Sequence, residues 1–333
     1  MKLSPLFHPV EYKDTYLSIL DETRLPQKQE YIKVTNISQA LKVLGEMKTR
    51  AYGQVLLFYY FVLLDAKQNK VGDSKKFNSG LDGLTKKFSK IRPTFGFPQF
   101  QSHLQAISKD IKKEENFLKG LEKRIISYIY SVERLRISRI KALSKLLPHS
   151  PKILTICNVS GELVVLAEEL KRQGQYVEFY ISETRPYLQG SRLTAWELNQ
   201  AGFKAHLFSD MQSASVFLKN NISAVIVGSD RSTQNGDIIN KIGTYSLAVL
   251  ARHFNVPFFA LAQPPGKTRS IKDIHIEFRP PEELLKFNNK FIAPKNQKAL
   301  YPSFDITPAD YVTKLICFDG VFSPQDFRKK WRK

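Results

Sequence analysis

The spacing of hydrophobic and polar residues changes near Pro148. Before this point, apolar residues recur at helical spacing over long stretches, whereas after it short apolar runs alternate with amphipathic segments. Pro148 and Pro151 lie at the change, and a proline stops a helix because it lacks an N–H group and clashes with the preceding turn. We therefore expect an N-terminal domain over residues 1–147 and a C-terminal domain over residues 148–333.

The first part of the N-terminal domain reads as short β-rich pieces over residues 1–35, followed by helices. Apolar periodicity predicts helices at 36–48 and 53–67, and one or two more within 101–147, while the polar stretch 67–80 reads as a loop. The most apolar run, QVLLFYYFVLLDA, is shorter than the roughly 20 residues that span a bilayer. It therefore predicts a buried helix, and the domain reads as small and mainly helical.

The C-terminal domain shows strand and helix patterns in alternation. The predicted strands, each followed by a helical pattern or a loop, are 152–158, 177–183, 204–210, 223–230 and 257–262. Such alternation builds an open parallel sheet covered by helices, so we predict an α/β fold with a Rossmann-like sheet. The segment lacks GxGxxG, so dinucleotide binding is not indicated.

Three residues with useful chemistry are expected at the carboxyl ends of these strands, where open α/β sheets bind ligands. Cys157 precedes a helix start, where backbone N–H groups and the helix dipole favour a thiolate. Asp230 ends a strongly apolar strand, where desolvation would suit its carboxyl to proton transfer. Lys241 is expected at the start of a helix, where ammonium and backbone N–H groups could share one phosphate.

Each of these residues also has a structural interpretation when it is taken singly. The cysteine could be a small core residue, the aspartate a helix cap and the lysine a solvated surface residue. Their convergence on one predicted sheet edge favours a site for a sugar phosphate.

The net charge of +20, from 51 Lys and Arg against 31 Asp and Glu, could mark a nucleic-acid-binding protein. The basic residues are spread through helical patterns without an aromatic platform, so we expect small phosphorylated partners and no nucleic acid. Two distant cysteines argue against a disulfide framework or a metal site. The N-terminal segment shows no apolar secretory core, which predicts a cytoplasmic protein without membrane association.

Several long motifs closely resemble the methylthioribose-1-phosphate isomerases, a family homologous to the regulatory subunits of the eukaryotic exchange factor for translation initiation. The motifs are ILTICN, SETRPYLQGSRLTAWELNQAG, AVIVGSDRSTQNGDIINKIGTYSLAVLA and YPSFDITPADYVT. The segments YLSILDETRLP, MKTR and IRPT extend the resemblance to the N-terminal domain, so that it runs nearly from end to end.

The resemblance implies an aldose–ketose isomerase of methionine salvage, which converts 5-methylthioribose 1-phosphate or a related 5-substituted sugar to the ribulose 1-phosphate form. Cys157 and Asp230 match the catalytic cysteine and aspartate of that family. The matching phosphate and sugar contacts are Arg50, Arg92, Gln189, Asn240 and Lys241, so the N-terminal domain is expected to contribute to the pocket. The resemblance also implies a homodimer formed mainly through the α/β half, with no metal or nucleotide cofactor.

Two departures from the family pattern bear on specificity. The turn Arg50–Gly53 carries a tyrosine at 52 where a small residue is expected, and QPPGKTRS replaces a small-Thr-Phe-Asp turn after the strand at 257–262. An active isomerase of altered specificity and a non-catalytic regulatory member of the family both remain open at this point.

Overall fold

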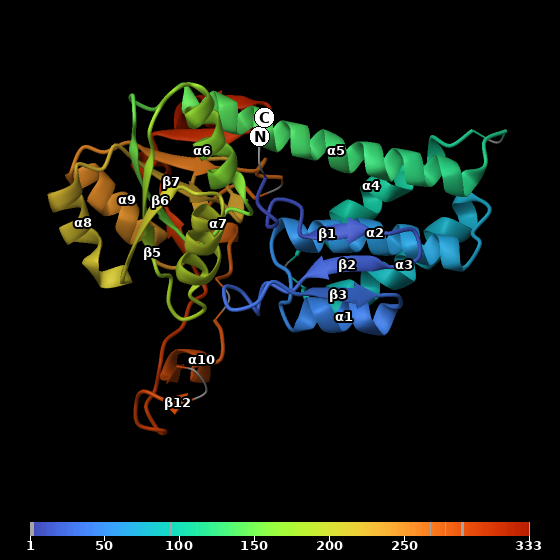
Figure 1. The fold of residues 1–333 in the computed structure, drawn as a ribbon. Helices are drawn as coiled ribbons and strands as arrows, with labels where there is room; N and C mark the ends of the chain where they lie inside the picture. The colour runs from blue at the N-terminus through green and yellow to red at the C-terminus, as the bar shows by residue number, and fades with distance from the viewer. Residues whose placement is uncertain are drawn as a thin grey trace. The chain divides into compact units, whose positions relative to one another are not determined.

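The computed structural model describes residues 3–93, 95–112, 114–266, 268–276, 278–287 and 290–332. The chain forms two compact units (Figure 1). One comprises residues 5–134, and the other comprises residues from 135 onwards together with the short segment before residue 5. The division falls inside the long helix α5 (Phe117–Ser144).

The 5–134 unit combines a small antiparallel sheet with helices. Its strands pair in the order β1-β2-β3. Its elements before α5 are β1 (Val10–Tyr12), β2 (Leu17–Leu20), β3 (Tyr31–Val34), α1 (Ile37–Gly45), α2 (Tyr52–Gln68), α3 (Ser74–Ile91) and α4 (Phe97–Lys109). The buried helix predicted from the apolar run is confirmed, because α2 is buried without interruption from Leu56 to Leu64. Aromatic rings from three helices pack against one another there, with the Phe58 centroid 5.1 Å from those of Phe88 and Phe97.

One predicted loop in this unit is wrong. Helix α3 begins at Ser74, inside the stretch 67–80 that its polar composition had marked as a loop. The Asp73 side chain caps the helix by accepting the Lys76 N–H at 2.8 Å. Phe77 and Leu81 begin a buried helical stripe, so sparse apolar residues at the right spacing outweigh the polar composition.

The unit from residue 135 onwards is built on a sheet of seven strands in the described part of the chain, in the order β15-β14-β10-β7-β4-β5-β6. The strands are β4 (Lys152–Ile156), β5 (Glu178–Ser182), β6 (Lys204–Phe208), β7 (Ala224–Gly228), β10 (Phe258–Leu261), β14 (Lys314–Cys317) and β15 (Gly320–Phe322). All neighbours pair in parallel except β14 with β15. The α/β fold with a mainly parallel sheet is therefore confirmed.

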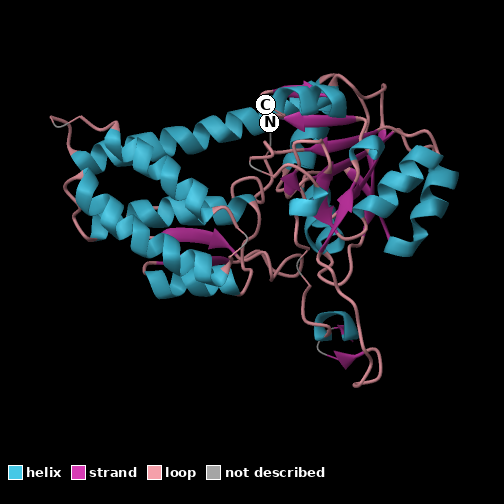
Figure 2. Cartoon of the chain, turned by 180° about the vertical axis from the view of Figure 1, so that it is seen from behind, coloured by secondary structure: helices cyan, strands magenta, loops and turns pink. Residues whose placement is uncertain are grey.

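Helices cover both faces of this sheet (Figure 2). They are α6 (Glu162–Arg172), α7 (Ala195–Gln200), α8 (Ser213–Asn220), α9 (Thr244–His253) and α11 (Pro324–Trp331), and a π-helical turn, Gly190–Thr194, leads into α7. Apolar side chains of β4 and β7 meet those of α9 in a core with Leu154, Val225 and Leu247. This rigid centre fixes the ends of the strands, from which the functional loops arise.

A second, smaller sheet joins β8 (Arg231–Ser232), β9 (Ile238–Lys241) and β13 (Phe304–Thr307) in antiparallel order. This sheet corrects one prediction: Lys241 is the last residue of β9, and helix α9 begins three residues later at Thr244. Between β10 and β13, the short helix α10 (Glu282–Leu285) and the strand pair β11 (Lys286–Phe287) and β12 (Lys290–Phe291) lie away from the main sheet (Figure 1).

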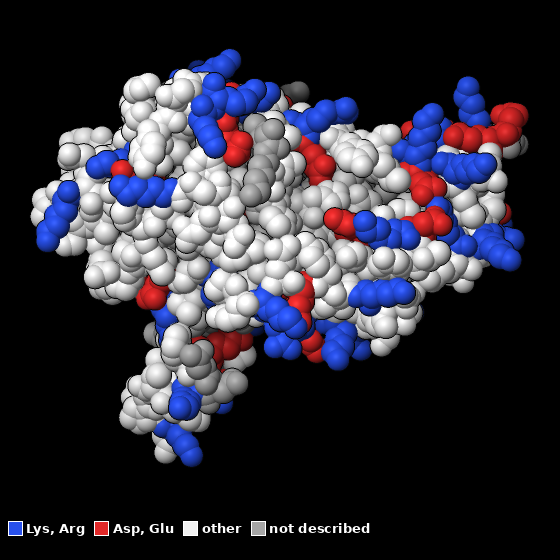
Figure 3. Space-filling model, in the orientation of Figure 1, with Lys and Arg blue, Asp and Glu red and all other residues white. Residues whose placement is uncertain are grey.

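Among the described residues, none of the helices has the length and apolar content to cross a bilayer. On the face drawn in Figure 3, the Lys and Arg side chains are scattered over the surface, and several lie beside Asp or Glu. The basic surplus on this face is therefore dispersed.

Candidate functional site

Three adjacent parallel strands bring the predicted catalytic residues to one edge of the sheet. β7, β4 and β5 are direct neighbours, and parallel strands end at the same edge. Cys157 directly follows β4, and Asp230 stands two residues after β7. The loop from 183 to 189, which ends in Gln189, follows β5.

Cys157 is half-buried, and its backbone is held in a left-handed conformation with φ of 65°. Its N–H donates to Thr184 Oγ1 at 2.9 Å, and its carbonyl accepts the Thr194 hydroxyl at 2.6 Å. Left-handed backbone costs a non-glycine residue about 1–2 kcal/mol, so it persists where the surroundings enforce it. The cysteine is therefore positioned by the loop after β5 and by the π-helical turn.

Gln189 sits at the start of that turn and is buried, with 5% of its surface exposed. Its Oε1 atom has no hydrogen-bond partner among the described residues. The next residue must be a glycine, because a Cβ on Gly190 would lie 1.8 Å from the Ser182 carbonyl oxygen. This close approach packs the turn against the end of β5 and fixes where the glutamine amide lies.

Asp230 and Asn240 lie on the β8–β9 hairpin. The Asp230 N–H donates to the Ile239 carbonyl at 2.9 Å, and Asn240 Nδ2 donates to Thr244 Oγ1 at 3.0 Å. Gly228 lets this hairpin approach the turn after Cys157, since a Cβ there would meet Val159 at 3.2 Å and Asn240 at 3.5 Å. The expected desolvation of the Asp230 carboxyl is wrong for this structure, because the residue is exposed beyond the end of the buried strand.

Lys241 is 8% exposed, and its ammonium donates to the Ser303 carbonyl at 3.1 Å and lies over the Phe304 ring. The predicted place of Lys241 at the start of a helix is wrong, because Lys241 ends β9 and α9 begins at Thr244. Two N–H groups at the start of α9 are used within the protein. Gly243 and Tyr245 donate them to Asp305 Oδ2 at 2.8 and 3.1 Å. Lys241 therefore does not belong to the first turn of α9.

Asp305 is the carboxylate that caps α9. Burial raises its pKa to about 6, although the backbone N–H groups of Tyr245 and Gly243 and the charge of Lys241 act in the opposite direction. Its Oδ1 atom has no hydrogen-bond partner among the described residues.

The two predicted arginines belong to the 5–134 unit. Arg50 makes an ion pair with Glu22, with 3.1 Å between Nε and Oε2, and Thr49 donates to the same carboxylate at 2.8 Å. Arg92 directly follows α3 as its C-cap residue, and its guanidinium contacts Met47 Sδ.

The Arg50–Gly53 turn also has a structural explanation. A Cβ on Gly53 would lie 1.9 Å from Thr49 Oγ1, so the glycine is required where helix α2 begins. Tyr52 is partly buried and packs against the hydrophobic core of the same unit.

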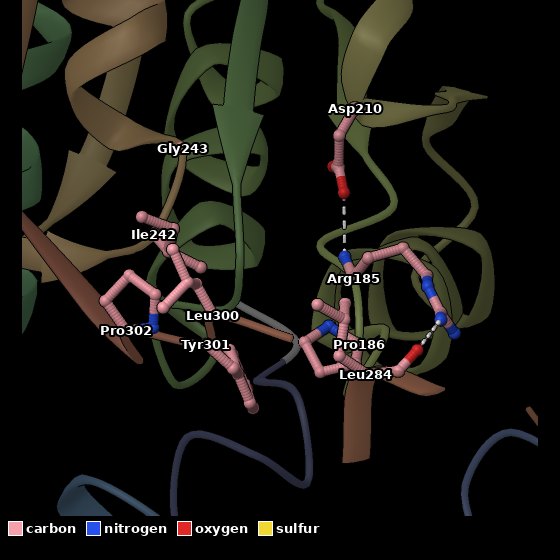
Figure 4. A pocket seen from close by; sticks show the side chains of 9 residues that line it. All are labelled: Arg185, Pro186, Asp210, Ile242, Gly243, Leu284, Leu300, Tyr301 and Pro302. Carbon is pink, nitrogen blue, oxygen red and sulfur yellow. Dashed lines mark hydrogen bonds between the residues drawn. The ribbon is translucent and has the colours of Figure 1, made fainter. Parts of the chain in front are cut away.

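A cavity of about 220 Å³ lies at the ends of β5 and β6 (Figure 4). Asp210 holds the loop after β5 there by accepting the backbone N–H groups of Thr184 and Arg185 at 2.8 and 2.7 Å. The Arg185 guanidinium donates to the Leu284 carbonyl at 3.3 Å. Most of the other residues that line the cavity are apolar, among them Pro186 and Leu284. Because Asp210 accepts these backbone N–H groups, its role here is to fix the loop after β5.

Sequence reasoning missed the polar face of β13 and the residues before it. Four side chains at alternating positions carry a buried polar atom without a hydrogen-bond partner among the described residues: Tyr301, Ser303, Asp305 and Thr307. Asp305 pairs in register with Asn240, so this face includes a predicted substrate contact. The alternation of polar residues with Phe304 and Ile306 in YPSFDIT was the available signal.

Comparison with known proteins adds a second line of evidence. The profile of the initiation factor 2 subunit family matches residues 58–324. The methylthioribose-1-phosphate isomerase of Exiguobacterium sibiricum is 32% identical, over 97% of this chain and 96% of its own length. The protein of the same name from Desulforudis audaxviator is 31% identical over 95% of each chain.

Two solved structures share the fold. The 5-methylthioribose 1-phosphate isomerase of Pyrococcus horikoshii OT3 superimposes with a TM-score of 0.85 at 28% identity, and the match covers 99% of this chain and 97% of that one. The translation initiation factor eIF-2B subunit delta from A. fulgidus gives a TM-score of 0.84 at 29% identity, over 98% and 99% of the two chains. The resemblance inferred from the motifs is thus confirmed.

Proposed function

This chain belongs to the initiation factor 2 subunit family, and from that membership we propose that it is an aldose–ketose isomerase of methionine salvage. The substrate is 5-methylthioribose 1-phosphate or a closely related 5-substituted ribose 1-phosphate, and the product is the ribulose 1-phosphate. The observation that carries the proposal is the match of about 30% identity to isomerases over nearly the whole chain.

Cys157 and Asp230 are the proposed acid–base pair. The reaction transfers a hydrogen from C2 to C1 of the sugar without net oxidation, so an acid and a base can run it, by enolisation or by hydride shift. Support comes from their position on the ends of the neighbouring strands β4 and β7. The exposure of Asp230 suits a group that must meet a substrate from solution.

The substrate is proposed to be held by Gln189, Asn240, Lys241, Arg50 and Arg92. The first three are supported by their burial and, for Gln189, by an amide oxygen that lacks a partner among the described residues. Arg50 and Arg92 rest on the motif match, and a guanidinium suits phosphate because its planar fork binds two oxygens.

A second candidate is a non-catalytic regulatory protein. It is favoured by the similarity to an initiation factor subunit, whose TM-score of 0.84 is close to that of the isomerase. The two candidates differ in their need for Cys157 and Asp230, since a regulatory subunit requires neither group.

We further propose that the isomerase is a cytoplasmic homodimer formed mainly through the α/β half, on the support of the family resemblance. Light scattering at micromolar concentration should then give twice the chain mass of 38.3 kDa. A monomeric mass would contradict the proposal.

The substrate is tested with the purified protein and a small panel of 5-substituted ribose 1-phosphates. Ketose formation is followed over time, with the 5-methylthio compound expected to give the highest kcat/KM. Faster conversion of another member of the panel would assign a different 5-substituent and leave the isomerase class intact.

A further inference from the structure

Tyr301 carries an unexplained polar group beside the candidate site. The side chain is 4% exposed, and its hydroxyl has no hydrogen-bond partner among the described residues. Folded proteins pair most buried polar groups, because an unpaired one loses its hydration without compensation. The tyrosine also lines the cavity at the ends of β5 and β6, beside Leu300 and Pro302 and across from Pro186 (Figure 4).

Burial keeps the Tyr301 hydroxyl protonated. Burial raises the pKa of Tyr301, and the charges of Tyr187, Glu283 and Cys157 raise it further, while Arg279 acts in the opposite direction. A protonated phenol in this place is a hydrogen-bond donor.

The neighbours of Tyr301 bind one another and leave its hydroxyl out. Arg279 donates from Nη2 to the Tyr187 hydroxyl and to Glu283 Oε1, the latter at 2.8 Å. Because this cluster is formed without Tyr301, the phenol is not needed to complete it. The Tyr301 hydroxyl therefore makes no hydrogen bond to the part of the chain that the structure describes.

Gln189 is a second buried group with an unused atom at the same edge. It follows Tyr187 by two residues in the loop after β5, and its Oε1 is a hydrogen-bond acceptor without a partner among the described residues. An unused donor and an unused acceptor together suit a ligand that offers both hydroxyl protons and oxygen lone pairs. A sugar phosphate has both kinds of group.

We propose that Tyr301 is a substrate-contacting residue, whose hydroxyl donates a hydrogen bond to an oxygen of the bound sugar phosphate. This assignment rests on the proposed isomerase function and extends it by one residue. The assignment predicts that the Tyr301 hydroxyl forms a hydrogen bond only when the ligand is bound.

The test is Tyr301→Phe, which removes the hydroxyl and keeps the ring. We expect kcat/KM for 5-methylthioribose 1-phosphate to fall about tenfold, as for the loss of one buried hydrogen bond. The free variant should unfold at the same temperature as the wild type or higher, because an unpaired buried polar group has been removed. The rise in unfolding temperature on adding the substrate should be smaller than in the wild type.

Tyr176→Phe is the matched control, since that side chain is 61% exposed in the same unit and should change neither quantity. Unchanged kcat/KM in Tyr301→Phe would overturn the assignment, as would a lower unfolding temperature combined with an unaltered response to substrate. If the wild type neither converts nor is stabilised by the substrate, the proposed function fails together with the assignment. If the wild type is active and Tyr301→Phe has the same kcat/KM, the assignment of Tyr301 fails and the proposed function stands.

Discussion

Two buried polar clusters in the unit from residue 135 onwards contrast in how far their groups are paired. In the first, the Glu162 carboxylate, 3% exposed, accepts from Arg136 Nε at 3.0 Å and from Arg139 at 2.6 and 2.7 Å. In the second, the β13 face from Tyr301 to Thr307, four buried polar atoms lack partners among the described residues. Both clusters contain buried polar atoms, but among the described residues only those of the first are fully paired.

The pKa values of Glu162 and Asp305 shift in opposite directions because their carboxyls are paired to different extents. Burial alone would raise the pKa of Glu162, yet the charges and hydrogen bonds of Arg139 and Arg136 outweigh it and hold the pKa below its ordinary value. Burial raises the pKa of Asp305 to about 6, because backbone N–H groups compensate only part of the lost hydration. A closed cluster thus stabilises the fold, whereas an open one keeps groups available for a ligand.

The largest effect is expected in the closed cluster. Glu162→Ala leaves two buried guanidinium groups without their counter-charge and should lower the free energy of unfolding by about 3–5 kcal/mol. Urea unfolding measures this, and Glu168→Ala, on the same helix but partly exposed, is the control and should change it by about 0.5 kcal/mol or less. An unaltered unfolding midpoint for Glu162→Ala would mean that the ion cluster contributes nothing to stability.

The proposed catalytic pair should show the reverse behaviour. Cys157→Ser and Asp230→Asn should each lower kcat by about a hundredfold or more, the scale of a general acid or base, while the unfolding midpoint stays near that of the wild type. Initial rates and thermal unfolding of the same preparations decide this. Near-normal turnover in either variant would remove that residue from the acid–base pair.

The Asp305 carboxyl should have a smaller effect on the free energy of unfolding, and this effect depends on pH. Because Asp305 has a higher pKa in the folded protein than in the unfolded chain, the folded state binds its proton more tightly. The stability from this proton is present below about pH 4 and is lost as the pH rises through about 6. Allowing for partial exposure, the loss is about 2 kcal/mol.

Asp305→Asn should remove this dependence of stability on pH. The difference in unfolding free energy between wild type and variant should therefore change by about 2 kcal/mol between pH 4 and pH 7. Denaturant unfolding at several pH values measures it. Asp310→Asn, an exposed residue of the same segment, is the control and should keep the wild-type profile. A constant difference for Asp305→Asn would show that Asp305 titrates alike in both states.

Much of the α/β fold could be predicted because each buried parallel strand is a short apolar run. The predicted strand at 223–230 contains β7, and the predicted helix after Cys157 contains α6. Lys241 was misplaced because Ile238–Lys241 continues directly into an apolar helix pattern, and only pairing with β13 shows that it is a strand. Pairing between distant segments is not visible in local periodicity.

The site was predictable as far as strand ends could be located. Cys157 and Asp230 could be placed on one edge from topology, but the exposure of Asp230 depends on how its hairpin leaves the sheet. The hydrogen bonds that position Cys157, one donated to Thr184 and one accepted from Thr194, depend on backbone turns that the sequence does not specify locally. Tyr301 lies far along the chain from Cys157, and no sequence spacing relates them.

The most direct test of the proposed isomerase function is the conversion of 5-methylthioribose 1-phosphate by the wild-type protein and by Cys157→Ser at equal concentration. The wild type should form the ribulose 1-phosphate, detected as a new ketone carbonyl signal by ¹³C NMR. The variant should be slower by about a hundredfold or more. Absence of ketose with the folded wild-type protein, or equal rates for both proteins, would contradict the claim that this sheet edge is an isomerase active site.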